Sequence, residues 1–468
     1  MNKIIKNWSY LILSNISTQM IGFFVMIFLA KKLSPEGYGE FNIILSIVAL
    51  FSVFANSGMN LVLTREVTLN IKSSKAIFSL IVPIRIFSFL ISTIALLIYL
   101  HINDFSFSVI YLFSIILILS NNLWDLSQSI AFGHLVTKYT TILNFVFSLV
   151  WLISVVVIPD SVFDIELIII IYAIILLIKG LSYLFVVHKK YIKNYKELIN
   201  LTRMSIFVMC IPYIWMRSLG AFADQVPILM LDNNSGSEEV GFYSLGARLV
   251  VPITIIINTG IVAIFPFLTK LFKEDVNQFK IRIIEGFNFV LVIGTLISVL
   301  LVLTSKYWII FLFGEQYFSS ILVFNTMAWF SVLLSFDLLL SAALSSTYKQ
   351  KTLAIITTID FLILFPIFYI GAQYGAIGFA NAKLIGGGIA VIYHIFVFNK
   401  ILKLNLNVFQ MFLGLLFFIL MFVITTYLES LLIQLILIAL VIMIYSLFKE
   451  SPFRQNIYLI KKLITKVK

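Results

Sequence analysis

The sequence predicts an all-α protein that crosses a membrane many times. Three observations lead to this prediction: 61% of the 468 residues are hydrophobic, only 12% are charged, and long apolar runs recur along the whole chain. About 20 apolar residues span a bilayer as a helix, and lipid offers no partner for backbone N–H and C=O groups, so such runs must be helical. The alternating pattern of a membrane β-barrel is absent.

The first apolar run, Trp8–Ala30, follows Lys3 and Lys6 as the core of a signal peptide would. It is too long for such a core and has no small-residue cleavage site, so we expect an uncleaved first helix. The criterion of about 20 residues predicts fourteen spans, twelve and an additional two. They lie at 8–30, 41–63, 77–100, 105–127, 139–158, 165–187, 206–231, 242–268, 286–304, 318–345, 353–371, 376–398, 408–427 and 430–448.

The basic residues between the spans predict the orientation. With both termini in the cytoplasm, 25 of the 33 lysines and arginines fall on the cytoplasmic side and only Lys31, Lys32 and Lys306 on the other. Membrane proteins show this asymmetry, so both ends are expected inside. The same distribution accounts for the net charge of +12 by topology and contact with anionic lipid. A nucleic-acid partner is therefore not expected.

The longest internal connection, residues 188–205, divides the chain into halves. Its apolar residues Ile192, Tyr195 and Ile199 recur at helical spacing among lysines, which predicts an amphipathic helix on the cytoplasmic surface. The basic tail has a similar pattern, and a surface helix and a solvated tail fit it equally. The predicted organisation is an N-terminal lobe at 1–187, this linker at 188–205, a C-terminal lobe at 206–398, two additional spans within 399–448 and the tail at 449–468.

A short repeat also relates the halves. EGYGEF at 36–41 and EEVGFY at 238–243 both read E-x-x-G-x-aromatic, and each opens a predicted helix. Repeated halves are common in transporters, where the substrate site lies between them.

Several segments together resemble a known family. Residues 29–65 contain P-E-x-Y-G-x-F before an apolar helix, and VGFYSLGARL at 240–249, FGEQY at 313–317 and YGAIGFANA at 374–382 follow in order. They resemble the polysaccharide-exporter family, the Wzx-type O-antigen flippases, in the superfamily that also holds the multidrug (MATE) exporters and the lipid II flippases. The resemblance covers roughly residues 1–400. Wzx-type members usually have twelve spans and the lipid II branch tends to have fourteen.

The resemblance implies two six-helix lobes around a central cavity, with alternating access. It also implies the function: moving a polyprenyl-diphosphate-linked oligosaccharide, such as an O-antigen unit for lipopolysaccharide, across the bacterial cytoplasmic (inner) membrane. The expected partners are this lipid-linked oligosaccharide, membrane lipids and the polysaccharide polymerase machinery. No cofactor is expected, and a proton gradient, a Na⁺ gradient or the membrane potential would drive transport.

Arg217 and Asp224 stand near the middle of the seventh span. Seven residues apart, they share one helix face but lie roughly 10 Å from each other, too far for a simple ion pair. A charge at the bilayer centre costs about 2.5–3.5 kcal/mol or more, so each must face protein or water. Either both line a cavity or each pairs with a neighbouring helix.

Further charges fall inside predicted spans. A diphosphate suits arginine, which binds its oxygens in a bidentate fork, and lysine, which binds as a point charge. The expected cavity cations are Arg85, Arg217, Arg248, Lys179 and Lys383, although the two lysines fit snorkelling toward an interface equally well. The expected counter-ions, or coupling sites for a proton or Na⁺, are Asp224, Asp337 and Asp360. Asn15 and Gln19 form a polar stripe that fits sugar hydroxyls or an interhelical seam.

Other classes fit less well. The four histidines have no metal-ligand spacing, no phosphate-binding loop or nucleophile motif is present, and no large extracytoplasmic loop offers a catalytic site, so an enzyme, including a multi-span polymerase or glycosyltransferase, is not expected. A MATE-type exporter of cationic drugs is the closer alternative. Its cavity should be chiefly acidic, whereas five cations fall within the spans here.

Overall fold

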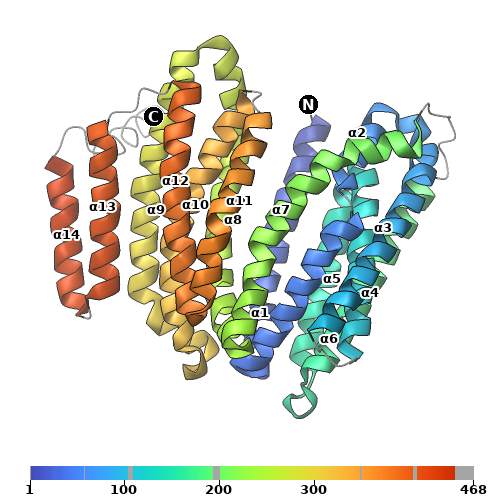
Figure 1. The fold of residues 1–468 in the computed structure, drawn as a ribbon, viewed down its shortest axis with the longest axis horizontal. Helices are drawn as coiled ribbons and strands as arrows, with labels where there is room; N and C mark the ends of the chain where they lie inside the picture. The colour runs from blue at the N-terminus through green and yellow to red at the C-terminus, as the bar shows by residue number, and fades with distance from the viewer. Residues whose placement is uncertain are drawn as a thin grey trace. The chain divides into compact units, whose positions relative to one another are not determined.

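The computed structural model describes residues 2–56, 58–103, 109–192, 201–347, 350–403, 408–428 and 430–447, and the regular structure within them is entirely helical (Figure 1). The pattern of contacts divides the chain into two compact units, Met1–Gly241 and Phe242–Lys468. The predicted fold class, an all-helical membrane protein, is confirmed.

The first unit is built around α1. α1 packs against α3, α4, α5 and α7, while α4 packs along α6 and α2 lies against α4. The helices are α1 (Asn2–Asn56), α2 (Met59–Leu69), α3 (Ser74–Ile102), α4 (Val109–Gly133), α5 (Lys138–Val157), α6 (Ile165–Val187) and α7 (Arg203–Ser235). α7 begins at a capping box, in which Thr202 and Ser205 exchange hydrogen bonds between side chain and backbone.

α1 is two helices joined at a kink, as the two predicted spans at 8–30 and 41–63 require. Ser34 there has φ 64° and ψ 169°, and Pro35 follows it. The chain turns back at this point (Figure 1). Gly236, between α7 and α8 (Ser237–Glu274), has nearly the same backbone angles, φ 88° and ψ 169°. Ser34 and Gly236 each stand two residues before the first glutamate of the repeated motif, so the repeat marks two equivalent reversals.

The two reversals meet at their glycines. A Cβ on Gly39 would lie 1.7 Å from the carbonyl oxygen of Ser237, and a Cβ on Gly241 would lie 2.0 Å from that of Pro35. Real Cβ contacts are never this short, so only glycine allows the backbones to approach in this way. The spacing that the two copies share therefore places Gly39 and Gly241 at the crossing of the two reversals, at the end of the first unit.

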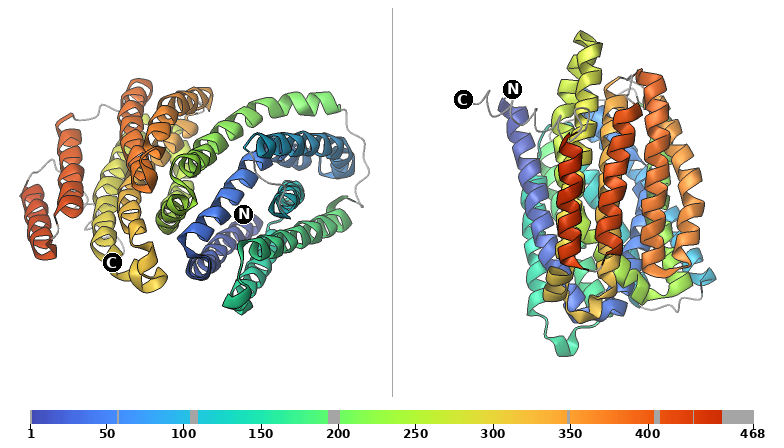
Figure 2. Two further views of the ribbon diagram at one scale, coloured as in Figure 1. Left: turned by 60° about the horizontal axis from the view of Figure 1, so that its bottom comes forward. Right: turned by 90° about the vertical axis from the view of Figure 1, so that its left-hand side faces the viewer.

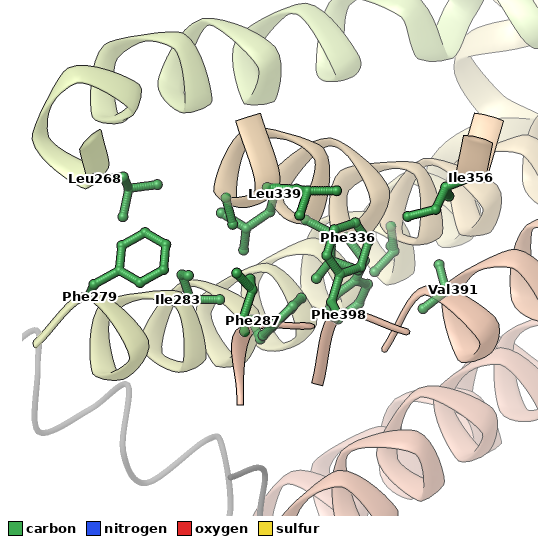
Figure 3. Packing of buried hydrophobic residues seen from close by; sticks show 14 residues of the cluster. Leu268, Phe279, Ile283, Phe287, Phe336, Leu339, Ile356, Val391 and Phe398 are labelled. Carbon is green, nitrogen blue, oxygen red and sulfur yellow. The ribbon is translucent and has the colours of Figure 1, made fainter. Parts of the chain in front are cut away.

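The second unit continues α8 and adds α9 (Val276–Phe313), α10 (Ser319–Ser346), α11 (Gln350–Ala372), α12 (Gly375–Leu402), α13 (Val408–Tyr427) and α14 (Leu431–Leu447). α10 packs against α9 and α12, and α11 packs against α12. Their shared core includes Phe279, Phe287, Phe336 and Phe398 (Figure 3). α13 packs on α9 and α14 on α13, so the last two helices form a pair on one side of this unit (Figure 2).

Each predicted span overlaps a helix. Within the described residues, nine helical segments are long and apolar enough to cross a membrane, and the described parts of α13 and α14 are shorter apolar helices. The number of spans, the cytoplasmic termini and the lobe boundaries stay predictions.

α7, assigned to the C-terminal lobe from the sequence, packs against α1, α2 and α3. In the predicted linker, His188–Ile192 form a π-helical turn; residues 193–200, like the tail, lie outside the described part.

Candidate functional site

An open pocket lies between α1 and α7 in the first unit. Its volume is about 320 Å³. Arg217 and Gln225 are its polar residues, and the remaining lining residues are small or apolar: Ala49, Val53, Gly220 and Ala221. The small side chains explain the space, because a Cβ on Gly220 would meet nothing within 4 Å. The pocket thus combines one cation, one amide and an apolar wall.

The charges on α7 are exposed in a helix that is otherwise apolar. Arg217 and Asp224 are both exposed, and within the described residues neither forms an ion pair. Arg217 lies fourteen residues into α7, roughly 21 Å from its first residue. A bare charge at that depth is too costly in lipid, so this face of α7 must meet water or a polar ligand. Asp224 lies on the same face, two turns further along.

Arg85 has a different environment. Its side chain is 2% exposed, and its guanidinium donates to the Asn122 backbone oxygen at 3.0 Å, to Asn122 Oδ1 at 3.1 Å and to Asn60 Oδ1. Asp125 Oδ2 accepts from Asn60 Nδ2 at 3.0 Å and from Asn56 Nδ2 at 2.6 Å. Arg85 is therefore linked through amides to Asp125, in a buried network that joins α1, α2, α3 and α4.

The remaining predicted cations are not among the residues that line the pocket. Lys179 is half-buried, with Nζ 4.1 Å from the centre of the Trp124 ring. Lys383, in the second unit, has Nζ between 5.5 and 6.0 Å from the ring centres of Tyr243, Phe368 and Phe379. Both are placed to make cation–π contacts. Arg248 is exposed on α8.

The predicted aspartates Asp337 and Asp360 lie on either side of His394. His394 Nδ1 is 2.8 Å from Asp337 Oδ1, and Nε2 is 2.9 Å from both carboxylate oxygens of Asp360. Asp337 belongs to α10, Asp360 to α11 and His394 to α12. The structure therefore brings together two carboxylates that are 23 residues apart in sequence. Asp224 belongs to the first unit and is not part of this group.

The polar stripe on α1 is only partly described. Gln19 is exposed. The side chain of Asn15 lies outside the described residues. Both roles weighed for the stripe stay predictions.

The sequence analysis did not single out the amide side chains that surround Arg85, nor His394. Asn122 and Asp125 are three residues apart on α4, a spacing that places both on one helix face, whereas Asn56 and Asn60 lie on different helices, α1 and α2. His394 was discounted because the four histidines lack metal-ligand spacing. Within the described residues no group of three histidine, cysteine or carboxylate side chains is arranged to hold a metal ion. His394 instead has carboxylates at both ring nitrogens, a contact that depends on three different helices.

Comparison with solved structures identifies the fold. The lipid II flippase MurJ, in an inward-closed conformation, matches with a TM-score of 0.67 and 18% identity, over 97% of this chain and 100% of that one. An inward-facing multidrug resistance transporter of the MATE family matches with a TM-score of 0.64 and 14% identity, over 83% and 95%. A MOP superfamily transporter from Pyrococcus furiosus, described with a binding pocket of reverse polarity, matches with a TM-score of 0.59 and 14% identity, over 86% and 96%. No curated protein sequence matches this chain.

The helical units and these likenesses define the class: a multi-span membrane protein with the fold of flippases and transporters. The family follows from the sequence. The family model for polysaccharide biosynthesis proteins matches residues 4–272, more than half of the chain, so the chain belongs to that family. The predicted relationship to polysaccharide exporters and MATE-like transporters is confirmed.

Proposed function

We propose that this protein is a flippase that moves a polyprenyl-diphosphate-linked oligosaccharide, such as an O-antigen repeat unit, across the bacterial cytoplasmic membrane. The observation that carries the proposal is Arg217, an exposed cation at mid-helix that lines the pocket and has no ion-pair partner among the described residues. The family and the likeness to a lipid II flippase support a lipid-linked substrate.

The chemistry of the pocket suits such a head group. Arginine binds a diphosphate through two parallel N–H···O bonds, which a point charge does not reproduce. Gln225 adds an amide that can donate to and accept from sugar hydroxyls. A drug exporter for cations would instead need an anionic or purely apolar wall at this place. Binding and release require no covalent step, so the protein acts as a transporter.

Moving a charged head group across the membrane costs free energy, so the transport needs a driving force. One charge moved through the membrane potential corresponds to about 2.3 kcal/mol per 100 mV. We infer that the potential, or a gradient of protons or Na⁺, supplies it. Asp224, exposed on the face that carries Arg217, would serve as the counter-charge when the pocket is empty.

The test measures surface polysaccharide and lipid-linked repeat units in cells that carry Arg217→Ala as the only copy of the gene. Loss of the polymer, with repeat units accumulating inside, is the expected result. The matched control is Arg203→Ala, which removes an exposed arginine at the first residue of the same helix, away from the pocket. Both variants must reach the membrane at the level of the unchanged protein. Normal display by Arg217→Ala would remove the main support for the proposal.

A second pair of variants tests the pocket without changing charge. Gly220→Leu would fill the space beside Arg217, whereas Gly388→Leu adds the same side chain at a glycine of α12 that also has open space around it. We expect only Gly220→Leu to reduce display. Arg217→Lys should recover part of the activity, because the charge remains while the bidentate geometry is lost. Full recovery would indicate that charge alone matters.

A further inference from the structure

His394 is held between two carboxylates from two other helices. Its side chain is 4% exposed, that of Asp360 is 18% exposed and that of Asp337 is 35% exposed. Nε2 is hydrogen-bonded to both carboxylate oxygens of Asp360 at 2.9 Å, and Nδ1 lies 2.8 Å from Asp337 Oδ1, at ion-pair distance but without hydrogen-bond alignment. The site thus joins α10, α11 and α12 at one point, with Asp337 as its most exposed member.

The contacts at the two ring nitrogens of His394 determine how many protons the ring carries. A neutral imidazole carries one N–H, so its other nitrogen is an acceptor. Here both nitrogens lie close to carboxylate oxygens, and an ionised carboxylate only accepts. With a neutral ring, one nitrogen lone pair would oppose a carboxylate at less than 3 Å, a repulsive contact that is costly away from water. A doubly protonated ring removes this repulsion, because Nε2–H donates to Asp360 and the charged ring forms an ion pair with Asp337 at Nδ1.

In the part of the chain whose side chains are described, no other cation pairs with these carboxylates. Asp337 is the only titratable residue of α10, and α11 carries Asp360 and Tyr369 besides Lys351, whose side chain lies outside the described part. α12 carries Lys383, Tyr393 and Lys400 besides His394. α9, which packs on α10, carries Lys280, Arg282, Glu285, Lys306 and Tyr307. None of these lysines or arginines forms an ion pair with either aspartate in the described part of the chain; Arg282 pairs with Glu285 at 2.6 Å.

The surroundings of the ring are apolar. The Phe398 ring lies 5.8 Å from the His394 ring, edge to face. Phe336 precedes Asp337, Ile356 lies one turn before Asp360, and Val391 lies one turn before His394. All four belong to the core of the second unit (Figure 3). In such a setting an ion pair is strong when it is complete and costly when one partner is lost.

We propose that Asp337, His394 and Asp360 form a reversible proton-binding site in the second unit. The bound form carries two carboxylates and an imidazolium, with a formal charge of −1. Release of one proton to water leaves two carboxylates and a neutral ring, with a formal charge of −2, and one ring nitrogen then faces a carboxylate with no proton between them. α12 consequently loses its attractive contact with either α10 or α11. Proton occupancy thereby controls how these three helices are joined.

The ligand is a proton, since the contacts leave no ring nitrogen free for a metal ion. This inference does not depend on the identity of the transported molecule. It stands on contacts within α10, α11 and α12, whereas the proposed function stands on the pocket of the first unit. The two can therefore fail separately.

The test uses the purified full chain in lipid nanodiscs, labelled with ¹⁵N in its four histidines. Removal of one signal by His394→Gln assigns the residue. At about pH 7, above the ordinary histidine value of about 6.5, both ring nitrogens of His394 should show the shifts of a protonated imidazole. Asp337→Asn and Asp360→Asn should each return the ring to ordinary titration. Glu285→Gln, which neutralises a carboxylate elsewhere in this unit, should leave the His394 signals unchanged.

The pH dependence of the protein's stability provides a second measurement. A site that holds a proton more tightly when folded stabilises the protein at low pH, and that contribution is lost as the pH rises. The thermal unfolding midpoint should therefore fall toward alkaline pH, and the fall should be smaller in His394→Gln. A ring with one unprotonated nitrogen at about pH 7 in the unchanged protein would overturn the proposal. So would a shift of the His394 signals when Na⁺ replaces choline at constant pH and ionic strength, because the site would then bind Na⁺.

Discussion

Replacing Gly39 by alanine tests the crossing of the two repeated motifs. The added Cβ would lie 1.7 Å from the Ser237 carbonyl oxygen and 2.7 Å from its carbonyl carbon. An ordinary contact needs about 3.4 Å or more, so the two backbones must separate by roughly 1.7 Å. Overpacking of this kind costs about 1–3 kcal/mol. Neither neighbour is a flexible side chain that could move away, so we expect the upper part of that range.

The matched control is Gly37→Ala, two residues earlier in the same motif. A Cβ there would find Leu33 Cβ at 3.4 Å, an ordinary contact. Alanine is favoured over glycine inside a helix by up to about 1 kcal/mol, so this variant should equal or exceed the stability of the unchanged protein. The two variants share the same chemical change and differ only in what the methyl group meets.

The measurement is the thermal unfolding midpoint of the purified protein in detergent. Gly39→Ala and Gly241→Ala should each lower it, whereas Gly37→Ala should not. Both damaging changes are relieved by the same separation of the backbones, so the double variant should lose less stability than the sum of the single ones. If Gly39→Ala matches Gly37→Ala, the two motifs do not cross at these glycines and the reasoning is refuted.

Three further predictions follow from other parts of the fold. Ser34→Gly should raise the free energy of unfolding by about 1 kcal/mol. The backbone angles at Ser34 destabilise the folded state by about 1–3 kcal/mol for a residue other than glycine, while glycine loses about 0.5–1 kcal/mol more chain entropy on folding. A lower unfolding midpoint than that of the unchanged protein would contradict this prediction. Arg85→Ala should destabilise the protein by about 3–5 kcal/mol, because it removes the cation from a buried network, and membrane protein level would report it; a normal level with lost transport would place Arg85 in the substrate path instead. Burial lowers the pKa of His134, between α4 and α5, so the unfolded chain takes up a proton first and stability falls as the pH drops below about 6.5. His134→Gln should flatten that part of the curve of unfolding midpoint against pH, and an unchanged curve would exclude His134 as its cause.

The helices could be predicted from the sequence because the membrane leaves a long apolar run few alternatives. Each predicted span overlaps a helix, and even the division of α1 was expected, since the residue before Pro35 is pushed out of the helical region. The left-handed φ of Ser34 was not expected, because serine rarely adopts it. It becomes intelligible only beside Gly236, which occupies the same place in the second copy of the repeat.

The candidate sites could be predicted only in part. Charge within an apolar span singled out Arg217 and Arg85 alike, yet one is exposed beside a pocket and the other is buried among amides. That difference depends on which helices pack together, and the packing of helices cannot be predicted from the residue types alone. For His394 a signal was available. Asp337 lies nine residues before the end of α10, Asp360 ten residues after the start of α11 and His394 eight residues before the end of α12. At about 1.5 Å per residue, alternating helices place all three at about the same depth.

The segments that resemble known exporters chiefly shape the backbone. Gly39 and Gly241 allow the crossing of two helix reversals, Gly246 lies against Phe324 of α10, and Gly378 of α12 lies against the Gly371 carbonyl of α11. Both polar residues of the pocket, Arg217 and Gln225, lie outside these segments.

Under the proposed function, substrate choice depends on Arg217 and Gln225, outside those segments. Arg217 and Gln225 fall within residues 4–272, the part matched by the family model, whereas Asp337, Asp360 and His394 lie beyond it. The pocket and the proton site accordingly belong to different units of one chain. A variant that abolishes the proton response of His394 but leaves substrate binding at Arg217 unchanged would separate the driving force from recognition. Loss of both together would mean that protonation in the second unit governs access to the pocket in the first.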